Sequence, residues 1–162
     1  MHTFAPAELD RERGYRMLDD LVDGPTQRAT LPGLEALAPG FPDWIVTSLF
    51  GGTYQREGLA LRDRQLLNLA ALAALGGVDP QLHGHVRSSL RVGLTAEQIV
   101  EVFVHLAPYI GVPKALAGLR VAAAALAEVG GEVDDEVDGG IGGEAEVGDE
   151  VAGGTGTAVA AR

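Results

Sequence analysis

The apolar side chains of this chain recur at the spacing of three to four residues that is typical of α-helices, and no segment alternates with period two long enough to predict a β-strand. The pattern is clearest over residues 61–75, where nearly the whole helical circumference is apolar, as in a helix buried against several others. Proline, glycine and capping residues mark the ends of the other helices. These are expected over residues 6–22, 33–38, 42–50, 79–92, 96–108 and 113–129. The pattern predicts an all-α, single-domain bundle of about six helices, with short loops that favour antiparallel neighbours.

Individual residues predict several of the helix ends. Thr95, followed three residues later by Gln98, forms a capping box that starts a helix. Pro108 lacks the N–H that would bond four residues back, so we expect it to kink or end that helix. Asp79 is expected to be the N-cap of the preceding helix. Residues 23–25, Asp-Gly-Pro, are expected to stop the first helix.

The negative charge of the chain is concentrated at its C-terminal end. The formal net charge is −11, from 23 acidic and 12 basic residues. Residues 130–162 hold nine of those acids, a single arginine, ten glycines and no aromatic residue. Such a segment cannot bury enough apolar surface to offset the entropy lost on ordering. We therefore expect a helical domain over residues 1–129 and a disordered, acidic, glycine-rich tail over residues 130–162, which solubilises the domain or docks a partner.

Composition excludes several classes of function. No face carries the clustered basic residues that neutralise phosphates, so nucleic acid is not an expected partner. The absence of cysteine excludes disulfides, thiolate nucleophiles and thiol peroxidase chemistry. The apolar runs are far shorter than the roughly 20 residues needed to span a bilayer, and the N-terminus lacks the apolar run of a signal peptide. We expect a cytoplasmic protein that does not bind membranes.

Three of the four histidines lie between residues 54 and 113, and helical geometry distinguishes two of them. His85 shares a face with Gln81 and apolar neighbours, whereas His83 shares the opposite face with Arg87. Two histidines two positions apart cannot jointly bind one metal ion, and no carboxylate–histidine spacing supports a site, so no metal is expected. His85 is the inward candidate, either as a hydrogen-bonded core residue or as a catalytic acid or base.

Arginines and tyrosines of the same stretch are candidate binding residues. Arg64 leads directly into the buried helix, where a partly desolvated guanidinium would suit a planar carboxylate. Arg56 precedes the turn before that helix. Both could instead be solvated or paired with acids such as Asp63. Tyr54 and Tyr109 could bind a ligand or simply pack with a polar tip in water.

The chain resembles a known family in three strings, which read RDRQLLNLAALAALG, QLHGH and VGLTAEQIVEVFVHLAPYIGVPKAL. They are similar to the carboxymuconolactone decarboxylase family, within the superfamily of alkylhydroperoxidase-D-like proteins. The resemblance covers residues 9–124 and implies an all-helical subunit that assembles into a homo-oligomer, commonly a trimer or hexamer. The redox branch of that superfamily has Cys-x-x-Cys-x-x-x-His where this chain has Val78, Gln81 and His85. The resemblance therefore points to the branch without cysteines.

The decarboxylase branch acts without metal or cofactor on γ-carboxymuconolactone in aromatic catabolism, which implies such a carboxylated lactone, or a related β-keto-type acid, as the substrate here. The resemblance assigns Arg64, with Arg56, to carboxylate binding and His85 to proton transfer or to the developing oxyanion. Further candidates for substrate binding are Gln81, Tyr109 and Tyr54. The alternative from another class is a non-catalytic helical oligomer that binds a small molecule or a partner protein.

Overall fold

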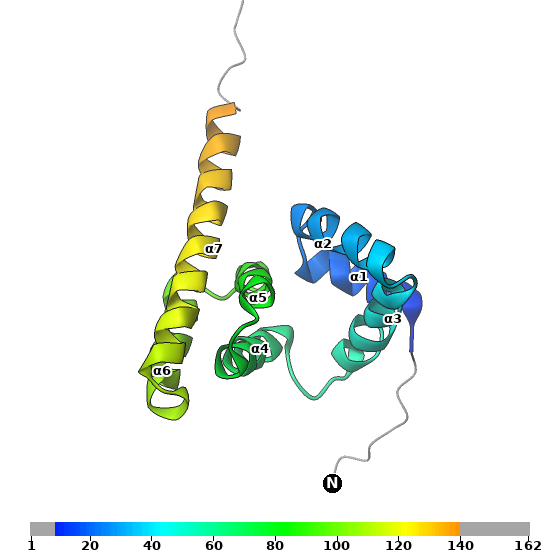
Figure 1. Cartoon of the computed structure of the whole chain (residues 1–162). Helices are drawn as coiled ribbons and strands as arrows, with labels where there is room; N and C mark the ends of the chain where they lie inside the picture. Colours follow the sequence, from blue (N-terminus) through cyan, green and yellow to red (C-terminus); the bar gives the residue numbers. More distant parts are fainter. Residues whose placement is uncertain (1–8, 140–162) are drawn as a thin grey trace, which may run out of the picture.

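A computed structural model describes residues 9–139 of the chain, with side chains described as far as residue 131. Within residues 9–139 the chain forms seven α-helices and two short helical turns, and no strand, so the predicted all-α fold is confirmed (Figure 1). None of the helices in this range has both the length and the apolar character needed to cross a membrane. The α-helices are α1 Arg11–Leu21, α2 Gly24–Leu37, α3 Phe41–Ile45, α4 Leu61–Leu75, α5 Asp79–Arg91, α6 Ala96–Ile110 and α7 Val112–Gly139; the π-helical turn is η1 Val46–Phe50 and the 3₁₀ turn is η2 Thr53–Gln55.

The main core is built by the four C-terminal helices, α4 to α7, which lie together in Figure 1. Its fully buried side chains are Leu69, Ala73, Leu82, Val86, Leu94, Ile99, Phe103, Ala122 and Ala125. Small residues let α7 pack closely on α6. A Cβ atom on Gly118 would lie 2.6 Å from the ring of Phe103, so only glycine allows this approach.

Helices α1 to α3 and turn η1 form a second group beside this core (Figure 1). Helix α1 crosses η1 at Gly14, where a Cβ atom would lie 2.7 Å from the carbonyl oxygen of Val46 and 2.9 Å from the amide nitrogen of Gly51. The amide of Asp10 donates to the carbonyl of Gly51 at 3.0 Å. This close crossing positions η1, and with it Phe50, beside the four-helix core.

Two arginines of α5 connect the two groups. Arg87 Nε lies 2.8 Å from Asp23 Oδ2, with only 9% and 15% of the two side chains exposed. Burial alone would raise the pKa of Asp23, but the hydrogen bonds from Arg87 and Thr26 outweigh it and lower the pKa to about 2. Arg91 adds hydrogen bonds to the carbonyl oxygens of Asp20 and Asp19, at 2.9 and 2.8 Å. The start of α2 is therefore tied to α5.

The region of α2 differs from the sequence prediction. Asp23 caps α2 by accepting the amide of Thr26 at 2.8 Å, and the helix runs from Gly24 to Leu37 instead of over residues 33–38. The Asp-Gly-Pro sequence therefore starts a helix as well as stopping one, because a proline in the first turn needs no N–H partner. Pro32 lies inside α2 without ending it. Of the side chains of α2, all of which are described, none is fully buried.

Other predicted ends are partly right. The bounds of α4 and the capping box of Thr95 with Gln98 are confirmed, whereas α5 is capped by Val78 and not by Asp79. Helix α6 continues through Pro108 to Ile110 and ends at Gly111, whose φ of 87° favours glycine. Pro108 lies in the last turn of α6, so the loss of its N–H donor and the bulk of its ring affect only the end of the helix.

Helix α7 continues to Gly139, past the end predicted at residue 129. Gly130 and Gly131 lower helix propensity by about 1 kcal/mol each relative to alanine, which does not oblige an established helix to stop. Residues 140–162 of the predicted tail, like residues 1–8, lie outside the described residues.

Candidate functional site

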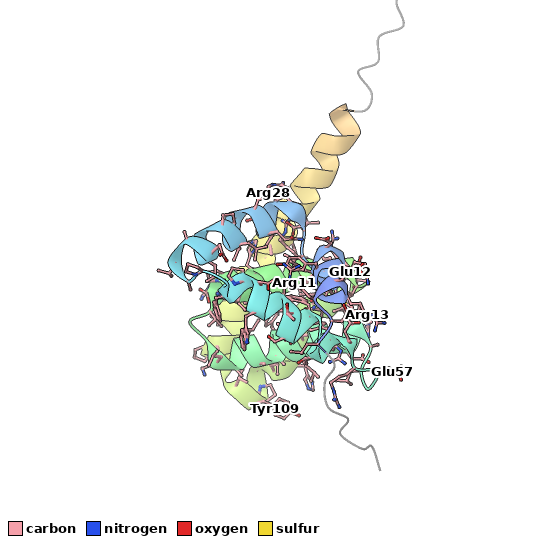
Figure 2. All side chains as sticks on the ribbon, turned by 90° about the vertical axis from the view of Figure 1, so that its right-hand side faces the viewer. Arg11, Glu12, Arg13, Arg28, Glu57 and Tyr109 are labelled. Carbon is pink, nitrogen blue, oxygen red and sulfur yellow. The ribbon has the colours of Figure 1, made fainter. Side chains whose placement is uncertain are left out.

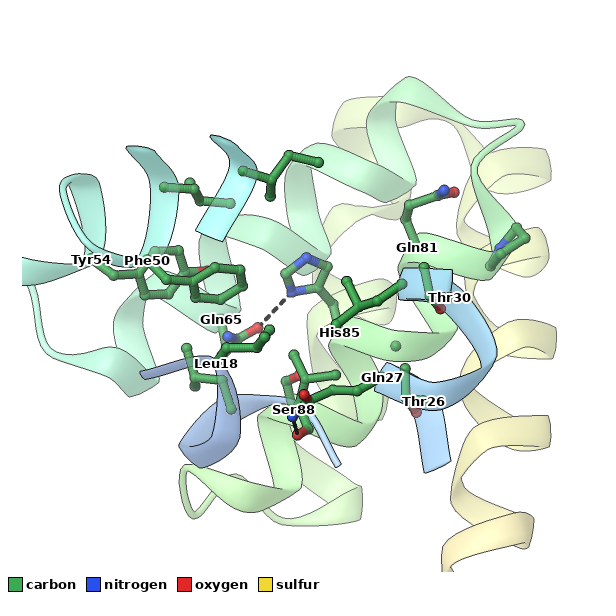
Figure 3. A pocket seen from close by; sticks show the side chains of 17 residues that line it. Leu18, Thr26, Gln27, Thr30, Phe50, Tyr54, Gln65, Gln81, His85 and Ser88 are labelled. Carbon is green, nitrogen blue, oxygen red and sulfur yellow. Dashed lines mark hydrogen bonds between the residues drawn. The ribbon is translucent and has the colours of Figure 1, made fainter. Parts of the chain in front are cut away.

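A cavity of about 310 Å³ lies between the N-terminal helices and the four-helix core. Helices α1 and α2 and the segment from α3 to η2 form one side, and α4 and α5 form the other (Figure 3). Most of the wall is apolar. Its apolar residues include Leu18, Leu21, Leu31, Ile45, Leu49 and Phe50. The polar side chains of the wall are Thr26, Gln27, Thr30, Tyr54, Gln65, Gln81, His85 and Ser88.

The imidazole of His85 and the amide of Gln65 point toward one another across the wall of the cavity (Figure 3). His85 Nδ1 lies 2.9 Å from Gln65 Oε1. An amide oxygen can only accept a hydrogen bond, so Nδ1 carries the proton and Nε2 holds a lone pair on the side away from Gln65. Burial lowers the pKa of His85 below its ordinary value of 6.5, because desolvation disfavours the imidazolium. The pair is therefore neutral at pH 7 and has a free basic nitrogen.

Gln65 is a site residue that the sequence prediction missed. It lies one turn into α4 and is 1% exposed. The fully buried residues of α4 are Gln65, Leu69 and Ala73, which follow one another at intervals of four. A glutamine on the innermost stripe of an apolar helix is the signal that could have found it, because a buried amide requires hydrogen-bond partners.

Tyr54 also lines the cavity, as one of the predicted binding residues. Its ring stacks on Phe50, with 5.2 Å between centroids, and its hydroxyl oxygen accepts a hydrogen bond from Asn68 Nδ2 at 2.8 Å. Burial raises the pKa of Tyr54, an effect opposed by the amide of Asn68, the charge of Arg64 and the amide of Gln65. The phenol therefore keeps its proton at neutral pH and can act as a hydrogen-bond donor.

The two predicted arginines do not line the cavity. The guanidinium of Arg64 donates to the carbonyl oxygens of Arg56, at 2.6 Å, and Leu59, at 3.2 Å. Its central carbon lies 5.7 Å from the centroid of the Tyr54 ring. Arg64 thus fixes the loop before α4 and reaches the cavity only through the ring of Tyr54. The part of Arg56 that takes part in this arrangement is its backbone carbonyl.

Of the other two predicted site residues, Gln81 lines the cavity and Tyr109 does not. Gln81 is exposed at the rim of the cavity, on the same helix as His85. Tyr109 is 74% exposed, lies 5.3 Å from the ring of His105 and projects outward at the end of α6 (Figure 2). The structure therefore brings His85, Gln81 and Tyr54 together and places Arg64, Arg56 and Tyr109 elsewhere.

The helices that carry this site match a protein family. The model of the carboxymuconolactone decarboxylase family matches residues 39–124. The chain belongs to this family. The match includes Tyr54, Gln65 and His85, whereas α1 and α2, which complete the cavity, lie outside it.

Two relatives of this carboxymuconolactone decarboxylase family member are characterised to different degrees. One, from Paracoccus denitrificans, is an uncharacterised 15.0 kDa protein of the nqo9–nqo10 intergenic region, 33% identical over 96 residues, which are 59% of this chain and 72% of the relative. The other, from Acinetobacter baylyi, is a 4-carboxymuconolactone decarboxylase, 29% identical over 119 residues, which are 74% of this chain and 88% of the relative.

Proposed function

We propose that this chain is a cofactor-independent decarboxylase of a carboxylated lactone or a related β-keto-type acid, with the cavity around His85 as its active site. The observation that carries the proposal is the neutral His85–Gln65 pair, which presents one basic nitrogen in an apolar cavity. Membership of the carboxymuconolactone decarboxylase family and the similarity to an enzyme of that name support it.

Decarboxylation of such an acid requires little covalent chemistry from the protein. The bond between the carboxylate carbon and its neighbour breaks, and the electron pair passes into the carbonyl group, directly in a β-keto acid or through the double bond of the lactone. Carbon dioxide leaves, and the enolate is protonated at carbon. The protein must orient the substrate, donate to the oxygen on which charge develops and supply one proton.

His85 supplies the proton in this proposal. A substrate carboxylate near Nε2 favours the imidazolium, because an opposite charge raises the pKa of a histidine. Proton uptake with substrate binding then leaves a neutral ion pair in the cavity. After carbon dioxide departs, the imidazolium returns this proton to the substrate carbon, and His85 becomes neutral again. One proton from water is consumed in each cycle.

The other wall residues orient the substrate. Tyr54 keeps its phenolic proton and donates it as a hydrogen bond to the enolate oxygen, while Gln81 contacts the substrate at the rim of the cavity. Arg64 acts indirectly, through Tyr54. Its hydrogen bonds to the loop carbonyls and its position beside the Tyr54 ring make it a positioning residue for Tyr54.

A direct assay tests the proposal. Purified protein is incubated with γ-carboxymuconolactone and, separately, with the β-keto acid benzoylacetate, and carbon dioxide release is followed. We expect release above the uncatalysed rate for at least one acid and a loss of about a hundredfold or more in His85→Ala, the usual effect of removing a general acid. Full activity in His85→Ala would remove His85 from the mechanism. Ligand binding without any release would instead support the non-catalytic alternative.

We also propose that the chain forms a homo-oligomer. Large apolar side chains are exposed on α6 and α7, at positions that include Val100, Val104 and Leu116. Val100 and Val104 lie one helical turn apart and share a face. Light scattering should give a mass that is a multiple of 16.8 kDa for the wild type and a smaller one for Val104→Lys. A monomeric wild type would contradict this proposal.

A further inference from the structure

The cavity contains very few groups that could balance the charge of a ligand. Among the described residues that line it, none is lysine, arginine, aspartate or glutamate. The only ionisable side chains of the wall are His85 and Tyr54, and a tyrosine cannot become a cation. The wall therefore offers one positive charge at most, and it does so only when His85 takes up a proton.

Three arginines adjoin wall residues in the sequence, and none of them lines the cavity. Arg28, next to Gln27, is exposed on α2, with its guanidinium beside Gly24. Arg64, next to Gln65, donates to the carbonyl oxygens of the preceding loop. Arg87, next to Ser88, is paired with Asp23 at 2.8 Å and lies 3.6 Å from a carboxylate oxygen of Glu128. Moving the guanidinium of Arg64 or of Arg87 into the cavity would break these contacts and, at Arg87, leave the carboxylate of Asp23 without its ion pair.

We infer that the substrate carries one carboxylate on an otherwise uncharged, largely apolar body, an inference that rests on the proposed decarboxylase function. One carboxylate can be neutralised by one proton on His85. A second carboxylate would enter the apolar wall without a counter-charge, and an unpaired buried charge is strongly disfavoured. γ-Carboxymuconolactone has two carboxylates, so the cavity selects the monocarboxylate members of the proposed substrate class.

The volume of the cavity and the apolar residues that α1 and α2 add to its wall agree with this substrate class. A volume of about 310 Å³ is at the small end of the usual range for small-molecule sites. Leu18, Leu21 and Leu31 come from α1 and α2, outside residues 39–124 that match the family model. The apolar surface that would receive the body of the substrate therefore includes helices beyond the matched part of the chain.

A pair of unreactive acids of similar size tests charge selection separately from catalysis. These are 3-phenylpropanoate, with one carboxylate and an apolar body, and adipate, with two carboxylates. Neither can lose carbon dioxide by the proposed route, so their binding can be measured by titration calorimetry whether or not the chain proves to be a decarboxylase. We expect the wild type to bind 3-phenylpropanoate at least about tenfold more tightly than adipate, since a single buried unpaired charge costs more than that factor.

Two lysine variants on the same helix complete the test. Thr30→Lys adds a cation at the cavity wall, and Ala36→Lys adds one at an exposed position of α2 that does not line the cavity. Thr30→Lys should shift the preference toward adipate by about tenfold, and Ala36→Lys should leave it unchanged. Equal or tighter binding of adipate by the wild type, no detectable binding of either acid, or equal shifts in the two variants would each overturn the inference. The proposed function fails separately, through absence of carbon dioxide release.

Discussion

Nδ1 of His85 lies 2.9 Å from the side-chain oxygen of Gln65, and this contact determines which nitrogen of the imidazole is free. Gln65 comes from the innermost stripe of α4 and His85 from the facing side of α5, two helices that pack against one another. Because the amide is buried, it cannot exchange its partner for bulk water without opening the helix pair. The tautomer of the histidine is therefore a property of the packing between α4 and α5.

Replacing Gln65 by glutamate should raise the pKa of His85. The substitution preserves the shape of the side chain and places a negative charge 2.9 Å from Nδ1, where it stabilises the imidazolium. The pKa of His85, which burial lowers in the wild type, should rise by about one unit or more, as measured by NMR titration of the ring protons. In the proposal, carboxylate binding weakens as the pH rises and His85 loses its proton. In the variant this weakening should therefore occur at a higher pH.

Gln65→Met is the matched control for the glutamate variant, because it fills a similar volume without adding a charge. Its His85 resonance should titrate near or below that of the wild type, because burial still disfavours the imidazolium. The resonance is assigned by its absence in His85→Ala. A Gln65→Glu protein that stays folded with an unshifted His85 would show that the two side chains are not in contact in solution.

The lowered pKa of His85 also makes stability depend on pH. The unfolded chain binds this proton near pH 6.5, whereas the folded chain binds it only at a lower pH. Between these two values the unfolded state holds more protons, so the free energy of unfolding falls as the pH falls. Above pH 6.5 the effect is absent, and below the folded pKa it is complete.

A His85→Gln variant should lack this component of the pH dependence. Urea unfolding at about pH 7.5 and about pH 5.5 should show a larger loss of stability for the wild type than for the variant. The variant removes one titrating group and leaves the rest of the chain unchanged. Identical losses in the two proteins would mean that His85 is protonated equally well in both states.

The fold class was largely predictable because several helices carry a clear start or stop signal. Helix α4 has the predicted bounds, since a turn precedes it and Gly76 follows it, and α6 begins at its capping box. The first part of α2 was not predicted, because Asp23, Gly24 and Pro25 fit the end of one helix as well as the start of the next. The cap that Asp23 provides and its contact with Arg87 show that these residues do both. That contact joins residues 64 positions apart, which no local pattern reveals.

Counting helical faces predicted His85 as the inward histidine of its helix, and in the structure it lines the cavity. Its partner Gln65 was not predicted, although it shares the buried stripe of Leu69 and Ala73, because the charged residues before it make the start of α4 look solvated. The position of Arg64 outside the cavity could not be predicted either, because the groups that hold it are the backbone carbonyls of Arg56 and Leu59. Side-chain types predict which chemistry is present, and packing decides which groups meet.

The contact between Asp23 and Arg87 should stabilise the N-terminal helices over the cavity. Asp23→Asn keeps the N-cap of α2 but removes the ion pair, and should lower the free energy of unfolding by about 2 kcal/mol. Asp23→Ala removes the cap as well and should lower it by roughly a further 1 kcal/mol. Urea unfolding at pH 7 measures both.

Measuring the same two proteins at lower pH provides the control for the ion pair. The folded pKa of Asp23, about 2, lies below its ordinary value of 3.8, so its contribution is fully present above pH 3.8 and is lost as the pH falls toward 2. The difference between wild type and Asp23→Asn should therefore shrink when the pH is lowered from about 5 to about 3. A difference that stays constant over this range would assign the effect to packing instead of charge.

The crossing of α1 over η1 should tolerate no side chain at Gly14. In Gly14→Ala the new Cβ atom would lie 2.7 Å from a backbone oxygen of η1, so the helices must separate, and we expect a loss of about 1–3 kcal/mol in urea unfolding. Gly33→Ala is the control, since it lies in α2 with no atom within 4 Å of its Cβ position and should stabilise by about 0.5–1 kcal/mol. Because η1 carries Phe50 into the cavity wall, Gly14→Ala should also weaken binding of 3-phenylpropanoate, whereas Gly33→Ala should not. A stable Gly14→Ala protein with unchanged binding would show that α1 and η1 are not packed this closely in solution.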